Sequence, residues 1–470
     1  MDEAFYLVVG CQWLNGLPPY AGSFDVKPPL LFLLMAGAEA LFGPALWAAK
    51  ALAIAAAAFT ACGLYLFGRR FIGELAGAAA SLLYLISVLN LGGTFSPAEL
   101  IMAPFTTFGM LIGAAALLDQ ARSNVPAFLA SGLLYGAAAC VKQTALFEAA
   151  PWALALVTGN RARPPWGAFA VFAAGICIVP GGFALYFGAI GHLKELIQDV
   201  VFSAIGRASV GYIAWSVAFR LLLTGLLPIL PIIAMAGIGW VERRSLQRDP
   251  VCRVLPILGA WTGGALIGIL ATRAMFVIYC IPLLQPLSLL AGTFVQRILG
   301  RIASPARRLL WRIGVLAICV AYSGWAVAPL LFEGRGNVKA AEAAAALIRH
   351  SGGLASDPIL VVDRDMLVYI AAHAEPPTGI FHPQQLLCPF PFKGAWHALS
   401  DSISRNPVFV VVSNSPVVRV CEEPHKRAAL ESTLARDYCT LGEFESSVTG
   451  WPGAFTVYGL KTRVSGSCLR

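Results

Sequence analysis

Long apolar segments separated by short polar loops dominate the first two thirds of the chain. Ten of these segments approach the ~17 to 25 residues that a helix needs to cross a bilayer. They are predicted at Pro44–Gly68, Leu75–Gly92, Leu100–Leu118, Val125–Cys140, Gln143–Gly159, Trp166–Ile190, Ile213–Trp240, Val254–Ala271, Ala274–Val295 and Leu309–Phe332. A further apolar run, Leu30–Phe42, is too short to span, so we expect it to form a helix on the membrane surface.

The boundary near Lys142 decides the predicted topology. The stretch Val125–Gly159 is short for two crossings, but two crossings keep every arginine-rich loop on one side of the membrane. A single tilted crossing would reverse the orientation of everything that follows it. We therefore expect a break at Lys142 and two crossings.

The pattern changes to that of a soluble domain after Phe332. Strands and helices are predicted to alternate along this part, which is typical of a small α/β domain, and we expect a largely parallel sheet. Strands are expected at Ile359–Val362, Val408–Val412, Thr440–Ser446 and Phe455–Leu460, and helices at Ala340–His350, Met366–Ala372 and Pro424–Arg436. The predicted organisation is an outer-surface loop with juxtamembrane helices at 1–43, a helical transmembrane domain at 44–333 and an extracytoplasmic α/β domain at 334–470.

Composition and charge agree with a polytopic membrane protein. Hydrophobic residues make up 58% of the chain and charged residues only 13%, against ~25% charged residues in soluble domains. The net charge of +9 comes mostly from arginines in alternate loops, which predicts that those loops are cytoplasmic. They are Arg69, Arg70, Arg122, Arg161, Arg163, Arg243, Arg244, Arg248, Arg253, Arg297, Arg301, Arg307, Arg308 and Arg312. The first loop, the Gly92–Glu99 turn, the Gly191–Tyr212 loop and the C-terminal domain then face outward, and no motif suggests nucleic-acid binding.

Four of the eleven cysteines lie in the predicted outer domain, where oxidation is expected. They are Cys388, Cys421, Cys439 and Cys468. Four cysteines allow three pairings, and the sequence does not choose between them. Their spacing does not match a metal site.

The first thirty residues carry charges that do not belong in lipid, namely Asp2, Glu3, Asp25 and Lys27. We interpret this stretch as a half-buried outer loop that faces an enclosed polar site. A carboxylate there can accept a proton from a hydroxyl group. The simpler alternatives are that Asp2 and Glu3 complement a helix N-terminus and that Lys27 extends toward the headgroups from the membrane surface.

Other charges sit in or beside the predicted spans, where they are costly and usually functional. Glu99 either caps a helix or lines the site, and Glu148 is expected to pair with Lys142. Cations at the outer surface suit a lipid phosphate, because guanidinium matches phosphate oxygens. The candidates for this role are Arg207 and Arg273, with interfacial anchoring as the alternative for Arg207. A metal at His192 has little support.

Several motifs resemble, in the same order, those of the bacterial glycosyltransferase family 39. These are membrane-embedded enzymes of the GT-C type that include relatives of the protein O-mannosyltransferases and of the lipid A aminoarabinose transferase. The matching stretches are Asp2–Tyr6, Gly16–Tyr20, Phe24–Leu30, Ser96–Glu99, Lys142–Ala145, Tyr279–Gly292 and Ile359–Leu387. The chain departs from the family in two places. Relatives normally have a membrane helix before the Asp-Glu pair, whereas this sequence begins at Met1, so we expect either a misassigned start or a missing helix. The chain also has Ile278-Tyr279 where many relatives have His-Tyr.

The resemblance implies an inverting transfer of a sugar from a polyprenyl-phosphate carrier to a hydroxyl of a lipid, glycan or protein. By carry-over, Asp2 is the catalytic base with Glu3 beside it, and Lys27 and Arg273 hold the carrier phosphate. The other implied substrate contacts are Tyr6, Asp25, Glu99, Lys142, Arg207 and Tyr279. A divalent cation near Asp25 stays open as a cofactor. The implied location is the bacterial inner membrane, with the C-terminal domain in the periplasm.

Two other classes of function are alternatives to an enzyme. A transporter or flippase of lipid-linked sugars would need a cavity without a base, but the sequence contains no internal repeat of the kind common in such carriers. A binding domain on a membrane anchor does not explain charges in four separate outer loops. Convergence of Asp2, Lys27, Glu99 and Arg273 on one outward cavity would favour the enzyme.

Overall fold

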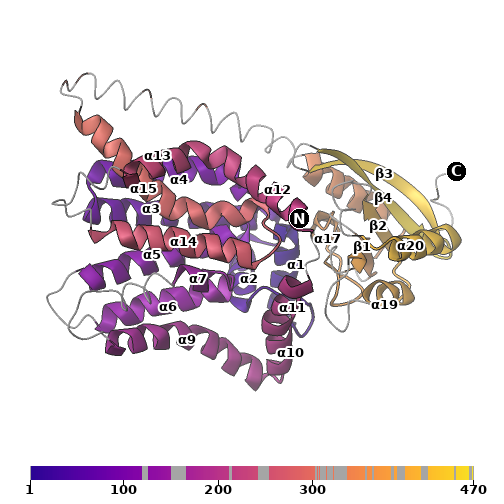
Figure 1. The fold of residues 1–470 in the computed structure, drawn as a ribbon. Coiled ribbons are helices and arrows are strands. Elements are labelled where there is room, and N and C mark those ends of the chain that lie inside the picture. Colours follow the sequence, from indigo (N-terminus) through magenta and orange to yellow (C-terminus); the bar gives the residue numbers. More distant parts are fainter. Residues whose placement is uncertain are drawn as a thin grey trace.

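The structure is a computed structural model of the 470-residue chain. It describes the chain apart from residues 1, 119–124, 150–165, 211–213, 242–252, most of 302–335, 355–356, 363–364, 383–385, 389–396, 414–421, 449–450, 465–467 and 469–470. Within that part, a bundle of long helices stands beside a smaller C-terminal domain with one sheet (Figure 1).

The long helices correspond to eight of the ten predicted spans. They are α3 (Leu46–Phe71), α4 (Glu74–Asn90), α5 (Ala98–Leu118), α6 (Val125–Val141), α9 (Trp166–Ala189), α12 (Trp215–Leu226) followed by α13 (Leu230–Val241), α14 (Leu255–Ala271) and α15 (Ile281–Arg301). Five stretches, including α12 with α13 as one, are long and apolar enough to cross a membrane, as expected of a multi-pass membrane protein.

The two remaining spans stay predictions. The stretch Gln143–Gly159 is described only as far as Ala149 and contains the short helix α7 (Ala145–Glu148), while Leu309–Phe332 lies almost wholly outside the described residues. Helix α6 ends at Val141 and a turn follows. A single continuous helix through Lys142 is therefore not formed.

Helix α15 lies at the centre of the bundle and α9 at its edge. Of the most apolar window of each, 78% of the α15 stretch but only 11% of the α9 stretch is buried in the protein. Glycines let neighbouring helices approach closely: a Cβ on Gly132 of α6 would lie 3.0 Å from Gly175 of α9, and a Cβ on Gly68 of α3 would lie 2.3 Å from Gly77 of α4. Small residues at such contacts are typical of helices packed in membranes.

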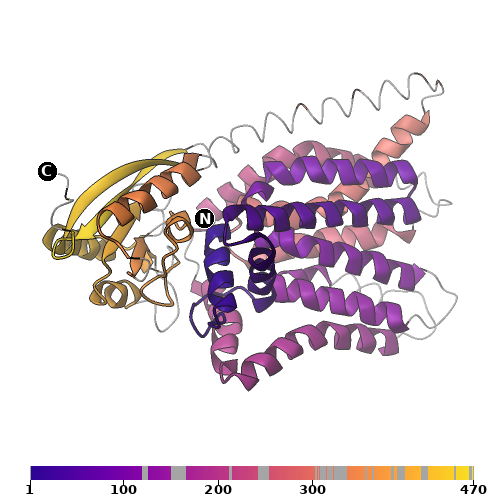
Figure 2. The same cartoon turned by 180° about the vertical axis from the view of Figure 1, so that it is seen from behind.

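Short helices cover the end of the bundle that faces the sheet. Helices α1 (Asp2–Leu14) and α2 (Pro29–Phe42) lie across the ends of the long helices, between the bundle and the C-terminal domain (Figure 2). Helices α10 (Leu193–Ile197), η2 (Gln198–Phe202) and α11 (Ser203–Val210) form a second crosswise element at the same end. The helix predicted at Leu30–Phe42 is thus present, and its crosswise direction fits a position at the membrane surface.

The C-terminal domain has four strands in the order β1-β2-β4-β3. They are β1 (Ile359–Val362), β2 (Phe409–Ser413), β3 (Tyr438–Val448) and β4 (Trp451–Leu460). Only β1 and β2 are parallel, whereas β4 is antiparallel to both β2 and β3. The expectation of a largely parallel sheet was wrong. Only two residues separate β3 from β4, and so short a connection can join only antiparallel strands.

Both faces of the paired strands β1 and β2 are covered. Ile359 and Val361 belong to a cluster that includes residues of the helix at 336–350, while Leu360 and Val362 face Leu430 and Leu434 of α20 (Pro424–Asp437). Burial on both faces explains why these strands read as continuous apolar runs. The short helices α17 (Leu367–Ala372) and α19 (Ala398–Ser404) complete the domain.

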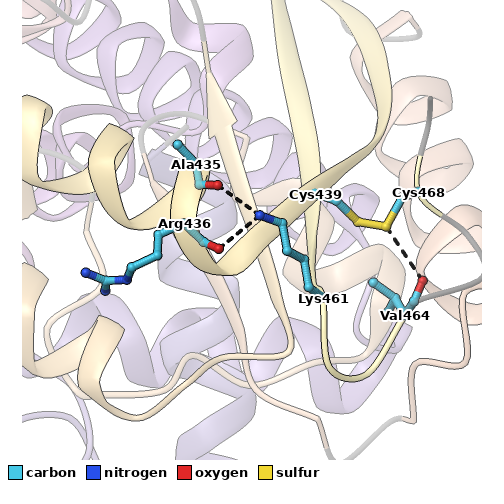
Figure 3. The surroundings of a disulfide bond; sticks show 6 residues. All are labelled: Ala435, Arg436, Cys439, Lys461, Val464 and Cys468. Carbon is cyan, nitrogen blue, oxygen red and sulfur yellow. Dashed lines mark hydrogen bonds between the residues drawn. A yellow bond between two sulfur atoms is a disulfide. The ribbon is translucent and has the colours of Figure 1, made fainter.

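The structure contains a disulfide between two of the four cysteines of the C-terminal domain. Cys439 of β3 and Cys468 form a disulfide, and Cys468 Sγ lies 3.9 Å from the carbonyl oxygen of Val464 (Figure 3). Beside it, Lys461 Nζ donates hydrogen bonds of 2.9 Å to two carbonyl oxygens in the last turn of α20, those of Ala435 and Arg436. A cation there stabilises the helix C-terminus.

The C-terminal domain contacts both the first loop and α1. The Phe24 amide donates to the Gly379 carbonyl oxygen at 2.8 Å, and the ring centroids of Phe381 and His382 each lie 5.0 Å from that of Phe5 in α1. A Cβ on Gly379 would lie 2.6 Å from the carbonyl oxygen of Gly22. Only glycine at position 379 allows the two backbones to approach this closely.

We predict that Gly379→Ala destabilises the folded protein by about 1 to 3 kcal/mol, because the added methyl group forces two backbones apart. Thermal unfolding of the purified protein in detergent checks this. Gly336→Ala is the matched control in the same domain, because a Cβ there meets no atom within 4 Å. Equal melting temperatures for the two variants would contradict the close contact.

Candidate functional site

A tightly held ion pair lies at the start of the chain. The buried Glu3 carboxylate accepts hydrogen bonds of 2.8 and 2.6 Å from Lys50 Nζ of α3. Lys50 also donates to the carbonyl oxygen of Thr94 in η1 (Gly93–Phe95). The pair therefore joins α1 to α3 and to the turn before α5. The sequence analysis gave Lys50 no role, although a lone lysine inside an apolar span is a signal for one.

A second, looser pair lies in the first loop. Lys27 Nζ is 3.4 Å from the buried Asp25 carboxylate and 5.0 Å from the centroid of the Tyr6 ring in α1. The backbone around it is fixed, because the Tyr20 hydroxyl donates to the Lys27 carbonyl oxygen at 2.6 Å. Tyr20 itself has a left-handed backbone with φ of 68°. The Pro-Pro segment thus presents the Lys27 side chain to the face of α1.

Asp2 lies on the same face of α1 as Tyr6. The two positions are four residues apart in the helix, which is about 6 Å along its axis. The side chain of Asp2 is outside the part that the structure describes. Its backbone position still brings it within one helical turn of the ring that Lys27 covers.

A third pair is enclosed between the long helices. Lys142, directly after α6, binds the buried Glu99 carboxylate at the start of α5, and its Nζ lies 3.7 Å from the centroid of the Tyr279 ring. Tyr279 belongs to η6 (Val277–Cys280), before α15. A cavity of about 10 Å³, which is close to the space that one water molecule needs, is lined by these three residues and by Glu148.

Glu148 is not the partner of Lys142, and that expectation was wrong. Its carboxylate accepts a 2.8 Å hydrogen bond from the Trp261 indole of α14. Glu99 is the partner of Lys142 because the start of α5 faces the end of α6. Helix α7 instead directs Glu148 toward α14. Glu99 lies in the first turn of α5 and also pairs with Lys142, so both alternatives for it stay open.

Electrostatic interactions link the second and third pairs. Burial lowers the pKa of Lys142 from the usual value of a lysine, Glu99 opposes this, and the charges of Lys27 and Arg207 lower the pKa further. Lys27 and Arg207, from two other elements, therefore lie close enough to Lys142 for their charges to act on it.

Gln143 ties the outer loops together. Its side-chain amide donates to the Val26 carbonyl oxygen at 2.6 Å and to the Val200 carbonyl oxygen in η2 at 3.0 Å. Next to Val200, burial raises the pKa of Asp199 to about 7, with smaller contributions from Asp25 and Glu195. The sequence motif Lys142-Gln143 thus serves two purposes, a charge for the site and a bridge between its walls.

Arg273 is turned to a neighbouring helix. Its guanidinium donates to the Ser209 carbonyl oxygen of α11 at 2.8 Å and lies 4.9 Å from the Trp215 ring centroid. Its backbone has a φ of 57°, in the left-handed region. The structure therefore brings together two groups of predicted site residues. Tyr6, Asp25 and Lys27 form one, and Glu99, Lys142 and Tyr279 form the other. Arg273 belongs to neither group and contacts α11 instead.

Metal-ligating side chains do not form a cluster of three or more within the described ranges of the chain. His192 lies 3.8 Å from Glu195 one helical turn away, which is a local contact on an outer helix. Burial, and after it the charges of Asp25 and Asp199, raise the pKa of Tyr20.

Comparison with known proteins identifies the type of fold. Residues 26–182, about a third of the chain, match the family model described as dolichyl-phosphate-mannose-protein mannosyltransferase. No curated protein matches the chain in sequence.

Solved structures resemble the whole chain. ArnT from Cupriavidus metallidurans bound to undecaprenyl phosphate is similar with a TM-score of 0.69 and 14% identity, covering 100% of this chain and 95% of that one. Its apo state has a TM-score of 0.66 and 15% identity, covering 100% and 94% of the two chains. The Archaeoglobus fulgidus oligosaccharyltransferase in complex with Zn and sulfate has a TM-score of 0.54 and 14% identity, covering 96% and 69%. The resemblance to GT-C type glycosyltransferases is confirmed in fold along the whole chain and in sequence pattern over residues 26–182.

We predict that Lys50→Met lowers the stability of the protein by more than Lys50→Met combined with Glu3→Gln. The single change leaves a buried carboxylate without its partner, and the coupling between two groups in direct contact is about 1 to 3 kcal/mol. The lower end applies because about a third of the Lys50 side chain is exposed. Melting temperatures of the two single variants and the double variant in detergent measure the coupling, and strictly additive effects would exclude it.

Proposed function

We propose that this chain, which has the GT-C fold, transfers a sugar from a polyprenyl-phosphate-linked donor to a hydroxyl group at the outer face of the membrane. The transfer inverts the configuration at the anomeric carbon. The acceptor belongs to a lipid, a glycan or a protein. The proposal includes a location in the bacterial inner membrane, with the C-terminal domain in the periplasm.

The observation that carries the proposal is the arrangement around α1. Asp2 lies one turn from Tyr6, and the Tyr6 ring is covered by Lys27 Nζ at 5.0 Å. An acidic position of α1 and a cation from a separate segment thus lie at one face of this helix. Sugar transfer with inversion requires both, a base for the attacking hydroxyl and a positive charge for the departing phosphate.

Hydrogen-bond lengths distinguish the roles of the lysines. Lys50 is held by Glu3 at 2.6 Å, which is as short as charge-assisted bonds become, whereas Lys27 is 3.4 Å from Asp25. Exchange of a 3.4 Å contact for a phosphate oxygen costs little. We therefore assign phosphate binding to Lys27 and a supporting role to Lys50.

The hydrogen bonds of Lys50 also distinguish the roles of Asp2 and Glu3. Glu3 is engaged by Lys50 through both oxygens, so its position is fixed and its lone pairs are occupied. It acts as a positioning residue that holds the first turn of α1. Asp2, beside it, is the proposed base.

The reaction then balances as follows. The Asp2 carboxylate takes the proton of the acceptor hydroxyl while the acceptor oxygen forms a bond to the anomeric carbon. The bond between that carbon and the phosphate oxygen breaks, and the electron pair leaves with the polyprenyl phosphate. The charge that builds on the phosphate is stabilised by Lys27, with Arg207 and Lys142 within electrostatic range of one another.

Solved relatives support the choice of carrier. ArnT was determined with undecaprenyl phosphate, and the oligosaccharyltransferase AglB from Archaeoglobus fulgidus with dolichol-phosphate and an inhibitory peptide. Both ligands are polyprenyl phosphates. A lipid carrier also fits a site placed at the ends of apolar helices.

We predict that Asp2→Asn lowers glycosyl transfer about 100-fold or more, which is the usual contribution of a catalytic base. Mass spectrometry of glycans and lipids compares cells lacking the chain with cells that express the wild type or a variant. Asp401→Asn, at an exposed position of α19, is the control and should restore the wild-type profile. Full restoration by Asp2→Asn would exclude the base and favour a transporter of lipid-linked sugars.

A second variant tests the phosphate contact. Lys27→Ala should weaken the binding of undecaprenyl phosphate about 10- to 100-fold, the equivalent of one lost charge-assisted hydrogen bond. The binding is measured on the purified protein by native mass spectrometry, with Lys339→Ala, an exposed lysine at the start of the C-terminal domain, as the control. Unchanged affinity in Lys27→Ala would assign the phosphate to other cations.

A further inference from the structure

A large crevice lies at the end of the bundle opposite the proposed active site. It has a volume of about 620 Å³ and is lined by three residues of α3, four of α5 and Ala127 of α6. This volume falls within the ~300 to 1,000 Å³ of sites that bind small molecules. Figure 1 shows the ends of α3 and α5 at this side, away from the C-terminal domain.

The crevice has an apolar floor. Ala115 and Ala116 of α5 form part of it, and their small side chains leave space between the walls that α3 and α6 provide. Leu66 of α3 and Leu111 and Ile112 of α5 make the rest of the surface apolar. A hydrocarbon chain is the kind of molecule that such a surface takes from a membrane.

The rim of the crevice is cationic. Arg69 and Arg70 both line it, both side chains are exposed, and both lie in the last turn of α3. Among the described residues that line the crevice, none is acidic. Because these arginines directly follow an apolar span, they lie at the level of the lipid headgroups, where guanidinium groups bind phosphate oxygens bidentately.

We propose that this crevice binds an anionic glycerophospholipid, with its phosphate at Arg69 and Arg70 and an acyl chain along the alanine floor. A polar molecule would gain nothing from the floor, and a neutral lipid would gain nothing from the rim. Basic pockets between transmembrane helices are known to hold anionic headgroups. The site is separate from the proposed carrier site, because it is formed by the far ends of α3 and α5.

Native mass spectrometry of the purified full-length protein tests the proposal. Phosphatidylglycerol adducts should survive at activation energies that remove phosphatidylcholine. In the double variant Arg69→Ala with Arg70→Ala, the retained phosphatidylglycerol should fall about tenfold or more, as expected for the loss of a charge-assisted contact. Arg220→Ala, which removes an exposed arginine from α12, is the control and should retain the wild-type amount.

A second variant tests the floor without removing charge. Ala115→Phe fills the crevice and should reduce phosphatidylglycerol retention while both arginines stay in place. The proposal is overturned if phosphatidylcholine is retained equally, or if neither variant loses phosphatidylglycerol. It is also overturned if glycerol 3-phosphate competes as well as the intact lipid, which would indicate a site for free phosphate esters. If the arginine variant loses undecaprenyl phosphate and keeps phosphatidylglycerol, the occupant is the carrier lipid and not a glycerophospholipid.

Discussion

A buried charge without a partner is costly, and this constraint organises the end of the bundle that faces the C-terminal domain. Three lysines, Lys27, Lys50 and Lys142, each meet a buried carboxylate from the first loop, α1 or α5. An unpaired charge at low dielectric costs several kcal/mol. The pairs therefore fix the relative positions of α1, α3, α5 and α6, and the differences in their tightness decide which lysine can exchange its partner for a substrate.

The fold followed from the sequence to a large extent, because apolar length is a strong signal for a membrane helix. The start of α5 and the end of α14, for example, fall within two residues of the predicted limits. The positions of the strands were predicted, but their relative directions in the sheet were not. Periodicity identifies a strand such as β4, but only the length of the connection to β3 requires the two to be antiparallel.

The sequence identified several residues that meet in the structure, but it did not identify their ion-pair partners. The sequence singled out Glu99, Lys142 and Tyr279, which meet in the structure, but it paired Lys142 with Glu148. Sequence distance favoured Glu148, which is six residues away, over Glu99 in another helix. Lys50 was overlooked for a related reason: its partner Glu3 is forty-seven residues away, and no local pattern connects them.

The contacts of α1 with Phe381 and His382 also order the assembly of the protein in time. Helix α1 leaves the ribosome well before the residues that complete its packing, which are about 380 positions later. At synthesis rates of roughly 5 to 20 residues per second this corresponds to a delay of roughly 20 to 75 s. During that interval Phe5 and its neighbours have no outer cover, so the carboxylates of the first turn reach their final positions only after the last membrane helices have been inserted and the C-terminal domain has folded against them. Maturation of the site is thus linked to completion of the chain, and a polypeptide arrested midway would hold its proposed base in an unfinished setting.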